Sequence, residues 1–543
     1  MDRRQRRGIA LAAMLAVLTT VGACGRAERR PDQAAETPVP GGTAVVAVAD
    51  EPDVLNSLVR TSAVAGTVLS LIEASLIEMT PALLWEPQVA ERWEVAPDSL
   101  SITYHLRPWC WEDGAPLTSA DVRLSWQLLT DPRVGSPRAD LLRDIADVTT
   151  PDSATVVYRF RQPPADPLTL TFHAIVPAHV VADLDPTRLD RWPTNRRPLA
   201  SGPFRLDSWD AGSQLVLARN PACPQLQPYL DRVVLRVMPD ETARILALEA
   251  GEVDVVSDVA PAAARRLADH PEIGLHEVSG RVFGFLMWNT RRPQLASPTV
   301  RKALSLAIDR GRFVDDLLGG YGEPAASYLP PVLWNHDRDL APDPFRPDSA
   351  RALLAAAGWR DGDGDGVRER DGLPLRIEII YRSGDSVREN GAVVLRQNLR
   401  DVGVDVSLRA LELGTALDFL RGGRFDAYWG EFQANLYADP SPLVQSGATD
   451  RFNFGGYANA RVDSLLAAAR ACRDRGIARP LWDALQVELA ADQPAAVIYY
   501  PRQIVAINRR LRDATPDMLS PVNYLHRWWI APADRRWMSA QER

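Results

Sequence analysis

The sequence has few residues of the kinds that build metal centres and catalytic sites. It holds four cysteines and seven histidines, and none of them falls in a CxxC or Cys/His metal spacing, so we expect no structural zinc. It contains no GxSxG, HExxH, Walker or dinucleotide-binding motif. His105 and His179 fall in a predicted strand and a loop, where a structural role is the better interpretation. We therefore predict no catalytic residues and no enzyme.

Lysine is almost absent, and long apolar runs are confined to the N-terminus. Lys302 is the only lysine, so an anion in a binding site would be held by arginine, whose planar fork suits carboxylates and phosphates. The apolar stretch from Ile9 to Thr20, even extended to Ala23, is shorter than the roughly 20 residues of a spanning helix. Because four arginines precede it, the stretch is typical of a signal peptide.

The apolar stretch ends in Val21-Gly22-Ala23-Cys24, which resembles the lipobox of bacterial lipoproteins, where the cysteine is acylated and becomes the new N-terminus. The alternative is an ordinary cleavage site followed by a chance cysteine. We predict a signal peptide over 1–23, and a lipidated cysteine with a flexible tether over 24–40. Acyl chains on Cys24 would hold the domain at a membrane surface, on the outer face of the cytoplasmic membrane or in the periplasm or cell envelope.

The chain without its signal peptide is acidic and long enough for several domains. Removing residues 1–23 changes the formal net charge from −8 to about −11, which argues against nucleic acid as a partner. The length suggests roughly two to four domains. In an exported protein two of the three remaining cysteines could form a disulfide, with Cys110 and Cys223 as the candidate pair; the alternative is that Cys110, Cys223 and Cys472 are all buried thiols.

Helix and strand patterns alternate after residue 41. Thr118 and Asp121 stand at capping-box spacing before an apolar run. Asp240 precedes a helical pattern that Gly251 ends. The patterns predict strands over 44–49, 253–256 and 375–381, and helices over 118–129, 241–250, 297–308, 348–358 and 387–401. Such mixing indicates an α/β protein.

Several short blocks, taken in order, resemble the family 5 extracellular solute-binding proteins, which include the oligopeptide, dipeptide and nickel binders of ABC transporters. Any one block is weak evidence, but their order is specific and spans about residues 41–510. The blocks are PQVAERWEV (87–95), ITYHLR (102–107), WEDGAPLTSADV (111–122), SGPFRL (201–206), RNP (219–221), GEVD (251–254), MWNT (287–290), VRKAL (300–304), AIDR (307–310), RFDA (424–427), ADP (438–440) and NF (453–454).

The resemblance implies an α/β, two-lobed periplasmic-binding-protein-like fold of type II, with an extra subdomain inserted in the first lobe. We expect lobe one to comprise 41–66, 196–283 and 500–543, the inserted subdomain 67–195, and lobe two 284–499. Crossing strands would form the hinge. A ligand enclosed between the lobes would favour the closed state through its higher affinity for that state.

The resemblance also implies a role as the binding lipoprotein of an ABC importer, acting as a monomer. Such a protein captures a peptide or other small polar solute and delivers it to the permease subunits. A surface receptor or chaperone-like peptide binder without transport is one alternative, and a hydrolase of the bound solute is a lesser one. Neighbouring permease and ATPase genes would favour transport, whereas turnover of the ligand would favour the hydrolase.

The resemblance places the ligand beside the segment 427–440 of lobe two. The residues that we expect to contact it are Trp429, Glu431, Phe432, Asn435 and Tyr437, because aromatic side chains beside amides and acids suit a binding cleft. Peptide-binding relatives carry an aspartate for the ligand's amine where this chain has Leu436 or Asn435. Glu431, which strand alternation places on one face with Trp429 and Gln433, could supply a carboxylate instead.

Three further candidates come from other segments that the resemblance places near the ligand. Trp288 and Asn289 belong to the strand where lobe two begins, and Asn56 lies in a loop after Glu51-Pro52. The alternative for each of these three candidates, and for each candidate in 427–440, is a side chain that packs in the core or in a loop without touching a ligand.

One acidic loop is a candidate for a structural calcium ion, and we predict no other cofactor. Asp361, Asp363 and Asp365 alternate before Gly366, a spacing that lets side chains in a tight loop converge on calcium. The twelfth position is Gly372 in place of a glutamate, and a strand pattern follows. The alternative is a solvated acidic turn without metal.

Overall fold

The computed structural model describes residues 37–535 apart from 165, 437, 449, 450 and 473. The predicted signal peptide, Cys24 and most of the predicted tether lie outside the described residues. In the part of the chain that is described, none of the helices combines the length and the apolar character needed to cross a bilayer.

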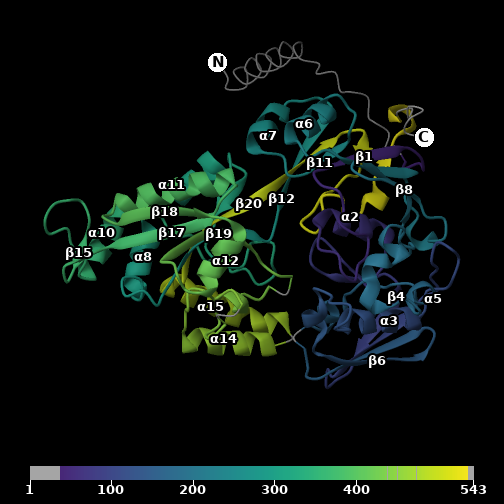
Figure 1. Cartoon of the computed structure of the whole chain (residues 1–543), viewed down its shortest axis with the longest axis horizontal. Coiled ribbons are helices and arrows are strands. Elements are labelled where there is room, and N and C mark those ends of the chain that lie inside the picture. The colour runs from purple at the N-terminus through teal and green to yellow at the C-terminus, as the bar shows by residue number, and fades with distance from the viewer. Residues whose placement is uncertain (1–36, 165, 437, 449–450, 473, 536–543) are drawn as a thin grey trace, which may run out of the picture. The chain divides into compact units, whose positions relative to one another are not determined.

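A 12-stranded mixed sheet joins segments from both ends of the chain (Figure 1). Its order is β18-β17-β19-β13-β20-β11-β1-β10-β9-β8, and β12 and β14 also pair with β20. The strands are β1 (Thr43–Val48), β8 (Phe204–Asp210), β9 (Gln214–Arg219), β10 (Arg232–Val237), β11 (Val255–Val256), β12 (Ile273–Ser279), β13 (Val282–Trp288), β14 (Gly322–Pro324), β17 (Arg376–Arg382), β18 (Asp405–Leu411), β19 (Ala427–Gln433) and β20 (Ala495–Asn508).

Strand β20, with 14 residues, is common to the two halves of this sheet (Figure 1). Its first part pairs with β13, from Ala495 to Tyr499. Its second part pairs with β12, from Arg502 to Asn508. Since β12 and β13 follow each other in the chain, two adjacent strands and β20 form the crossing between the halves. The predicted lobe boundaries at 283/284 and 499/500 fall within β13 and β20; the division into lobes stays a prediction.

The alternation of side chains along β20 connects it to four hydrophobic clusters. Ala495 and Val497 belong to the cluster around Phe283 and Tyr328, whereas Ala496 and Ile498 belong to the cluster around Trp429. In the second part, Val505 and Ile507 join the cluster around β1, and Ile504 and Ala506 join the cluster around α6. Because successive side chains point to opposite faces, both faces of the sheet are covered in each half.

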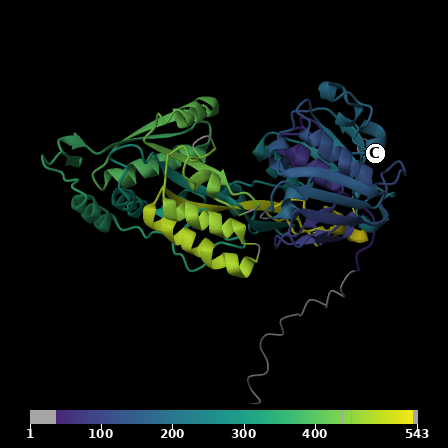
Figure 2. The same ribbon diagram turned by 90° about the horizontal axis from the view of Figure 1, so that it is seen from below.

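The helices lie against the large sheet and in the predicted insert, and α14 and α15 lie side by side (Figure 2). The α-helices are α2 (Ala63–Ile72), α3 (Ser119–Thr130), α4 (Pro167–Thr171), α5 (Ala178–Val181), α6 (Glu241–Glu249), α7 (Pro261–Leu267), α8 (Pro298–Leu306), α9 (Arg310–Arg312), α10 (Pro347–Ala356), α11 (Ser386–Arg400), α12 (Leu413–Arg421), α13 (Ser441–Val444), α14 (Ala460–Ala471) and α15 (Arg475–Asp492). The π-helical turn Phe313–Leu317 follows α9.

Local signals in the sequence explain where several helices begin. The Asp121 carboxylate accepts a hydrogen bond from the Thr118 backbone N–H at 2.7 Å, as the predicted capping box requires. At α6, the Asp240 side chain accepts from the Ala243 N–H at 2.7 Å. Gly251 follows α6 with φ of 71°, a conformation that glycine adopts without strain. All five predicted helices and all three predicted strands are present, with ends shifted by a few residues.

A second sheet, of four strands in the order β4-β5-β7-β6, lies within the predicted insert. Its core is rich in aromatic residues and is shared with α3. Its strands are β4 (Ala90–Val95), β5 (Ser101–Leu106), β6 (Ile145–Asp152) and β7 (Thr155–Phe160). Three two-stranded ribbons complete the fold: β2 (Ile77–Met79) with β3 (Trp85–Pro87), β15 (Glu369–Arg370) with β16 (Leu373–Pro374), and β21 (Leu511–Arg512) with β22 (Trp529–Ile530).

The predicted disulfide is wrong for this structure. Cys110, Cys223 and Cys472 are free thiols, and only Cys223 is fully buried. Cys223 packs into the core around the four-stranded sheet, and burial raises the pKa of its thiol to about 11. This packing gives Cys223 the role of a small apolar side chain.

Candidate functional site

Trp429 of β19 lies in the core between the sheet and α11. The residue is fully buried, and its indole Nε1 donates to the Arg388 carbonyl at 3.0 Å. Its ring packs edge-on against Phe313 and Tyr499, with centroids 5.5 and 5.9 Å away. In this structure Trp429 holds α11 on the sheet, and its predicted contact with a ligand stays a prediction.

Glu431, on the same face of β19, is part of a polar network. Its carboxylate accepts hydrogen bonds from the Tyr499 hydroxyl at 2.8 Å and from Arg388 at 3.0 Å. Arg388 also pairs with Asp385 at the start of α11. The Glu431 side chain is 25% exposed and that of Arg388 is 15% exposed. Both oxygens of Glu431 thus have protein partners, so a ligand amine would have to compete with Arg388 for this carboxylate.

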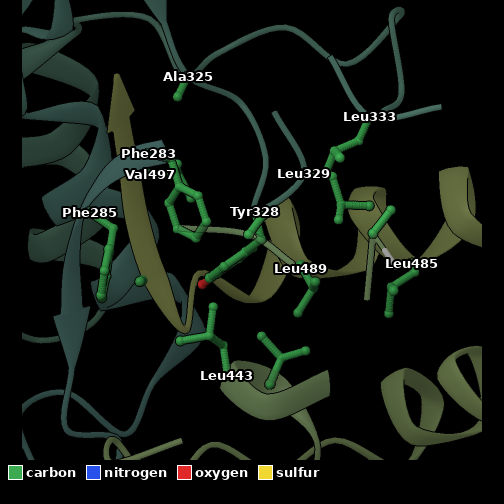
Figure 3. Close-up of a cluster of buried hydrophobic side chains, with 14 of the residues drawn as sticks. Phe283, Phe285, Ala325, Tyr328, Leu329, Leu333, Leu443, Leu485, Leu489 and Val497 are labelled. Carbon is green, nitrogen blue, oxygen red and sulfur yellow. The ribbon is translucent and has the colours of Figure 1, made fainter. Parts of the chain in front are cut away.

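Phe432 lies on the opposite face of β19, in a chain of aromatic side chains that leads from the core to the surface. Its ring centroid is 5.9 Å from that of Phe283 and 5.2 Å from that of Phe452. Phe283 in turn meets Tyr328 at 5.9 Å within a buried cluster (Figure 3). Phe452, at the other end, is 45% exposed. Among the residues predicted to contact a ligand, Phe432 therefore connects this apolar core to the exposed ring of Phe452.

The loop after β19 is held together by Asn435. Its side-chain oxygen accepts from the Asp439 N–H, and its Nδ2 donates to the Asp439 carbonyl, both at 3.1 Å. Leu436, the other residue at the position of the relatives' aspartate, packs partly buried against the apolar cluster around Phe283. Tyr437 lies outside the described residues. Asn435 thus shapes the loop in which the ligand contacts are predicted.

Trp288 and Asn289, at the end of β13, are both buried. Trp288 belongs to the same core cluster as Trp429. The Asn289 amide donates to the carbonyls of Gly423 and Phe425 at 3.2 and 2.8 Å, which ties the end of β13 to the turn before β19. The structure therefore places both residues away from Phe432 and Asn435, in packing and tethering positions.

Asn56 lies far from β19 along the chain and links the predicted first lobe to the predicted insert. It is 6% exposed; its Nδ2 donates to the Asn195 side chain at 2.9 Å, and its Oδ1 accepts from the Leu58 N–H at 3.0 Å. The neighbouring Ser57 hydroxyl donates to the carboxylate of Glu73. Burial raises the pKa of Glu73 to about 7, although Ser57 and nearby arginines act against this rise.

The acidic loop brings together the three predicted aspartates and a residue that the sequence did not single out. Carboxylate oxygens of Asp361, Asp363, Asp365 and Glu369 lie within 4.8 Å of one another. The turn itself also uses these oxygens: Asp361 accepts from the N–H groups of Gly364 and Gly366 at 2.7 and 3.1 Å. The calcium site in this loop stays a prediction.

Two arrangements at the site were not predicted from the sequence. The partner of Glu431 is Arg388, from a helix that precedes it by 43 residues, and no local spacing links the two. Arg281, in the link between β12 and β13, bonds to the loop after β19. The only feature of the sequence that could have drawn attention to Arg281 is its position as a single arginine between two strand patterns. His105 contacts Glu94 and His179 contacts Asp113; the structural roles predicted for these histidines stay predictions.

Residues 85–453 match the family model described as "Bacterial extracellular solute-binding proteins, family 5 Middle". The oligopeptide-binding protein AppA of Bacillus subtilis is 25% identical over 550 residues, which cover 98% of this chain and 100% of AppA. The structure of AppA with a nonapeptide has a TM-score of 0.73 at 24% identity, covering 91% of this chain and 100% of AppA. NikA from Brucella suis, solved with Fe(III)-EDTA, has a TM-score of 0.78 at 21% identity, covering 87% of this chain and 96% of NikA.

These likenesses confirm the predicted fold class: a mixed α/β fold of the type II periplasmic-binding-protein kind.

Proposed function

Because this chain belongs to the bacterial extracellular solute-binding proteins of family 5, as its sequence motifs indicate, we propose that it captures a solute for an ABC importer. In this proposal the exported chain is anchored through acylated Cys24. Two lobes close over a peptide or other small polar solute and present it to the permease subunits. AppA is named as an oligopeptide-binding protein, and we propose no catalytic step.

The observation that carries the proposal is the shared strand β20. Its two parts pair with β13 in one half of the sheet and with β12 in the other. Few strands cross between the halves, so each half can move as a packed body about this crossing. A ligand that touches both halves then stabilises the closed arrangement by its differential affinity.

The relatives were named for or solved with ligands of different classes, so the class of ligand is inferred from the residues of this chain. AppA is named for oligopeptides, and NikA was solved with a metal chelate. In this chain the charge of Glu431 is balanced by Arg388, and Phe432 and Phe452 supply apolar surface nearby. Both features suit a peptide or other small solute that is recognised by side-chain packing as well as by charge.

Thermal-shift screening against peptides, sugars, metal chelates and opines tests this function. A solute that binds only the folded protein raises the melting temperature, by an amount that grows with concentration above its Kd. Small-angle scattering of the same protein should then show a smaller radius of gyration with the solute than without it. A confirmed solute that leaves the radius unchanged would contradict closure, and turnover of the solute would contradict a binding role.

A further inference from the structure

Arg281 lies at the point where the chain passes between the two halves of the sheet. It stands in the link between β12 and β13, which pair with different parts of β20. Its backbone carbonyl accepts from the Ala434 N–H at 2.8 Å, and its Nη1 donates to the Ala434 carbonyl at 2.5 Å. Ala434 lies between Phe432 and Asn435, so Arg281 borders the loop of the predicted ligand contacts.

The charge of Arg281 has no carboxylate partner within 4.0 Å in the described part of the chain. The side chain is half-buried, and its Nε is buried without a hydrogen-bond partner among the described residues. Burial alone lowers the pKa of the guanidinium. A guanidinium has five N–H donors, and a half-buried cation with unused donors costs free energy unless a partner arrives.

Other buried arginines in the same half of the protein are satisfied in different ways. Arg301 donates to four backbone carbonyls, including those of Asp492 and Gln493. Arg310 donates to the carbonyls of Val497, Ser305 and Asp343 and to the Ser305 hydroxyl. These side chains stabilise the fold through their donors. Arg281, by comparison, keeps donors free beside a loop where the ligand is expected.

We propose that Arg281 binds a carboxylate of the ligand. This inference rests on the proposed function and narrows it to solutes with a free carboxylate, either the C-terminus of a peptide or an organic acid. Arginine can hold a carboxylate through two parallel N–H···O bonds, which fixes orientation as well as charge. Because Arg281 stands in the crossing, the bound carboxylate would lie where both halves of the sheet meet.

A competition between two forms of one probe tests the inference. The protein, purified after export from its full-length gene, is mixed with random tetrapeptides that end in a carboxylate and with the same tetrapeptides ending in an amide. Captured peptides are quantified by mass spectrometry. We expect the wild type to enrich the carboxylate form about 10-fold or more, since a charged hydrogen-bonded pair is worth that much in affinity. Succinate is then added, and we expect it to displace the captured peptides. Displacement would show that an organic acid also binds to Arg281.

Variants separate a binding role from a structural one. Arg281→Gln should bring the enrichment to about 1, and Arg281→Lys should keep part of it. The matched control is Arg376→Gln. Arg376 of β17 forms an exposed ion pair with Asp405 of β18, and this variant should behave as wild type. Enrichment that survives in Arg281→Gln, or equal capture of both forms by the wild type, overturns the inference and leaves peptide capture intact.

A ligand-free measurement decides the matter if neither tetrapeptide form is captured, an outcome that would count against peptide binding itself. Glutamine can still donate to the Ala434 carbonyl but carries no charge. If the cation serves a ligand, Arg281→Gln melts at the wild-type temperature or above it. A melting temperature lower by several degrees would show that the fold itself needs the cation, and the inference would fail.

Discussion

Glu73, at the end of α2, gives a prediction whose size follows from the structure. Its pKa is raised from 4.5 to about 7, first by burial and against the hydrogen bond from Ser57 and the charges of Arg60 and Arg138. Each unit of difference between the folded and unfolded pKa corresponds to about 1.4 kcal/mol of stability. Because the Glu73 residue is only partly buried, we reduce the resulting effect on the free energy of unfolding to about 2 kcal/mol. Because the folded pKa lies above the unfolded one, the stabilising contribution is complete below about pH 4.5 and is lost as the pH rises through about 7.

Glu73→Gln keeps an acceptor for Ser57 and removes the ionisable group. We expect it to raise the free energy of unfolding by about 2 kcal/mol at pH 8 and to change it little at pH 4.5. Urea denaturation at the two pH values measures the difference, with the exposed Glu91→Gln on β4 as the control. The same change at both pH values, or a loss of stability at pH 8, would refute the assignment of this raised pKa to Glu73.

Three further predictions concern packing, anchoring and thiols. A Cβ at Gly284 would lie 2.5 Å from the buried ring of Tyr499, so Gly284→Ala should lower the free energy of unfolding by about 2 kcal/mol. A Cβ at Gly280 meets nothing within 4 Å, so Gly280→Ala is the control and should leave the urea midpoint unchanged. Cys24→Ser should move the exported protein from the membrane fraction to the soluble fraction on immunoblots; retention in the membrane would contradict acylation. Alkylation of the unfolded, unreduced chain should label the thiols of all three described cysteines, and a missing pair of labels would mean a disulfide.

The fold was predictable because its signals are local. Caps such as Asp240 and the pair Thr118 and Asp121 sit beside the helices that they begin. The order of the family motifs along the chain supplied the fold class, which no single motif could do. Strand ends were less accurate: the strand predicted from Val253 begins at Val255 in the structure, because pairing with β1 and β20 sets its length.

The site was harder to predict, because large side chains on β19 and β13 suit both a cleft and a core. Both faces of β19 are covered, so alternation could not separate Trp429, which is buried, from Phe432, which is not. The neutralisation of Glu431 depends on Arg388 and Tyr499, which are distant in sequence. The missing partner of Arg281 could not be seen until the chain was folded.

The late position of β20 bears on how the protein is made. Both halves of the large sheet take core side chains from residues 495–507, and these are synthesised after every other strand of that sheet. A nascent chain therefore cannot complete the core of either half until β20 has been synthesised. Such a delay suits a polypeptide that must cross a membrane unfolded, since stable intermediates would obstruct the translocation channel.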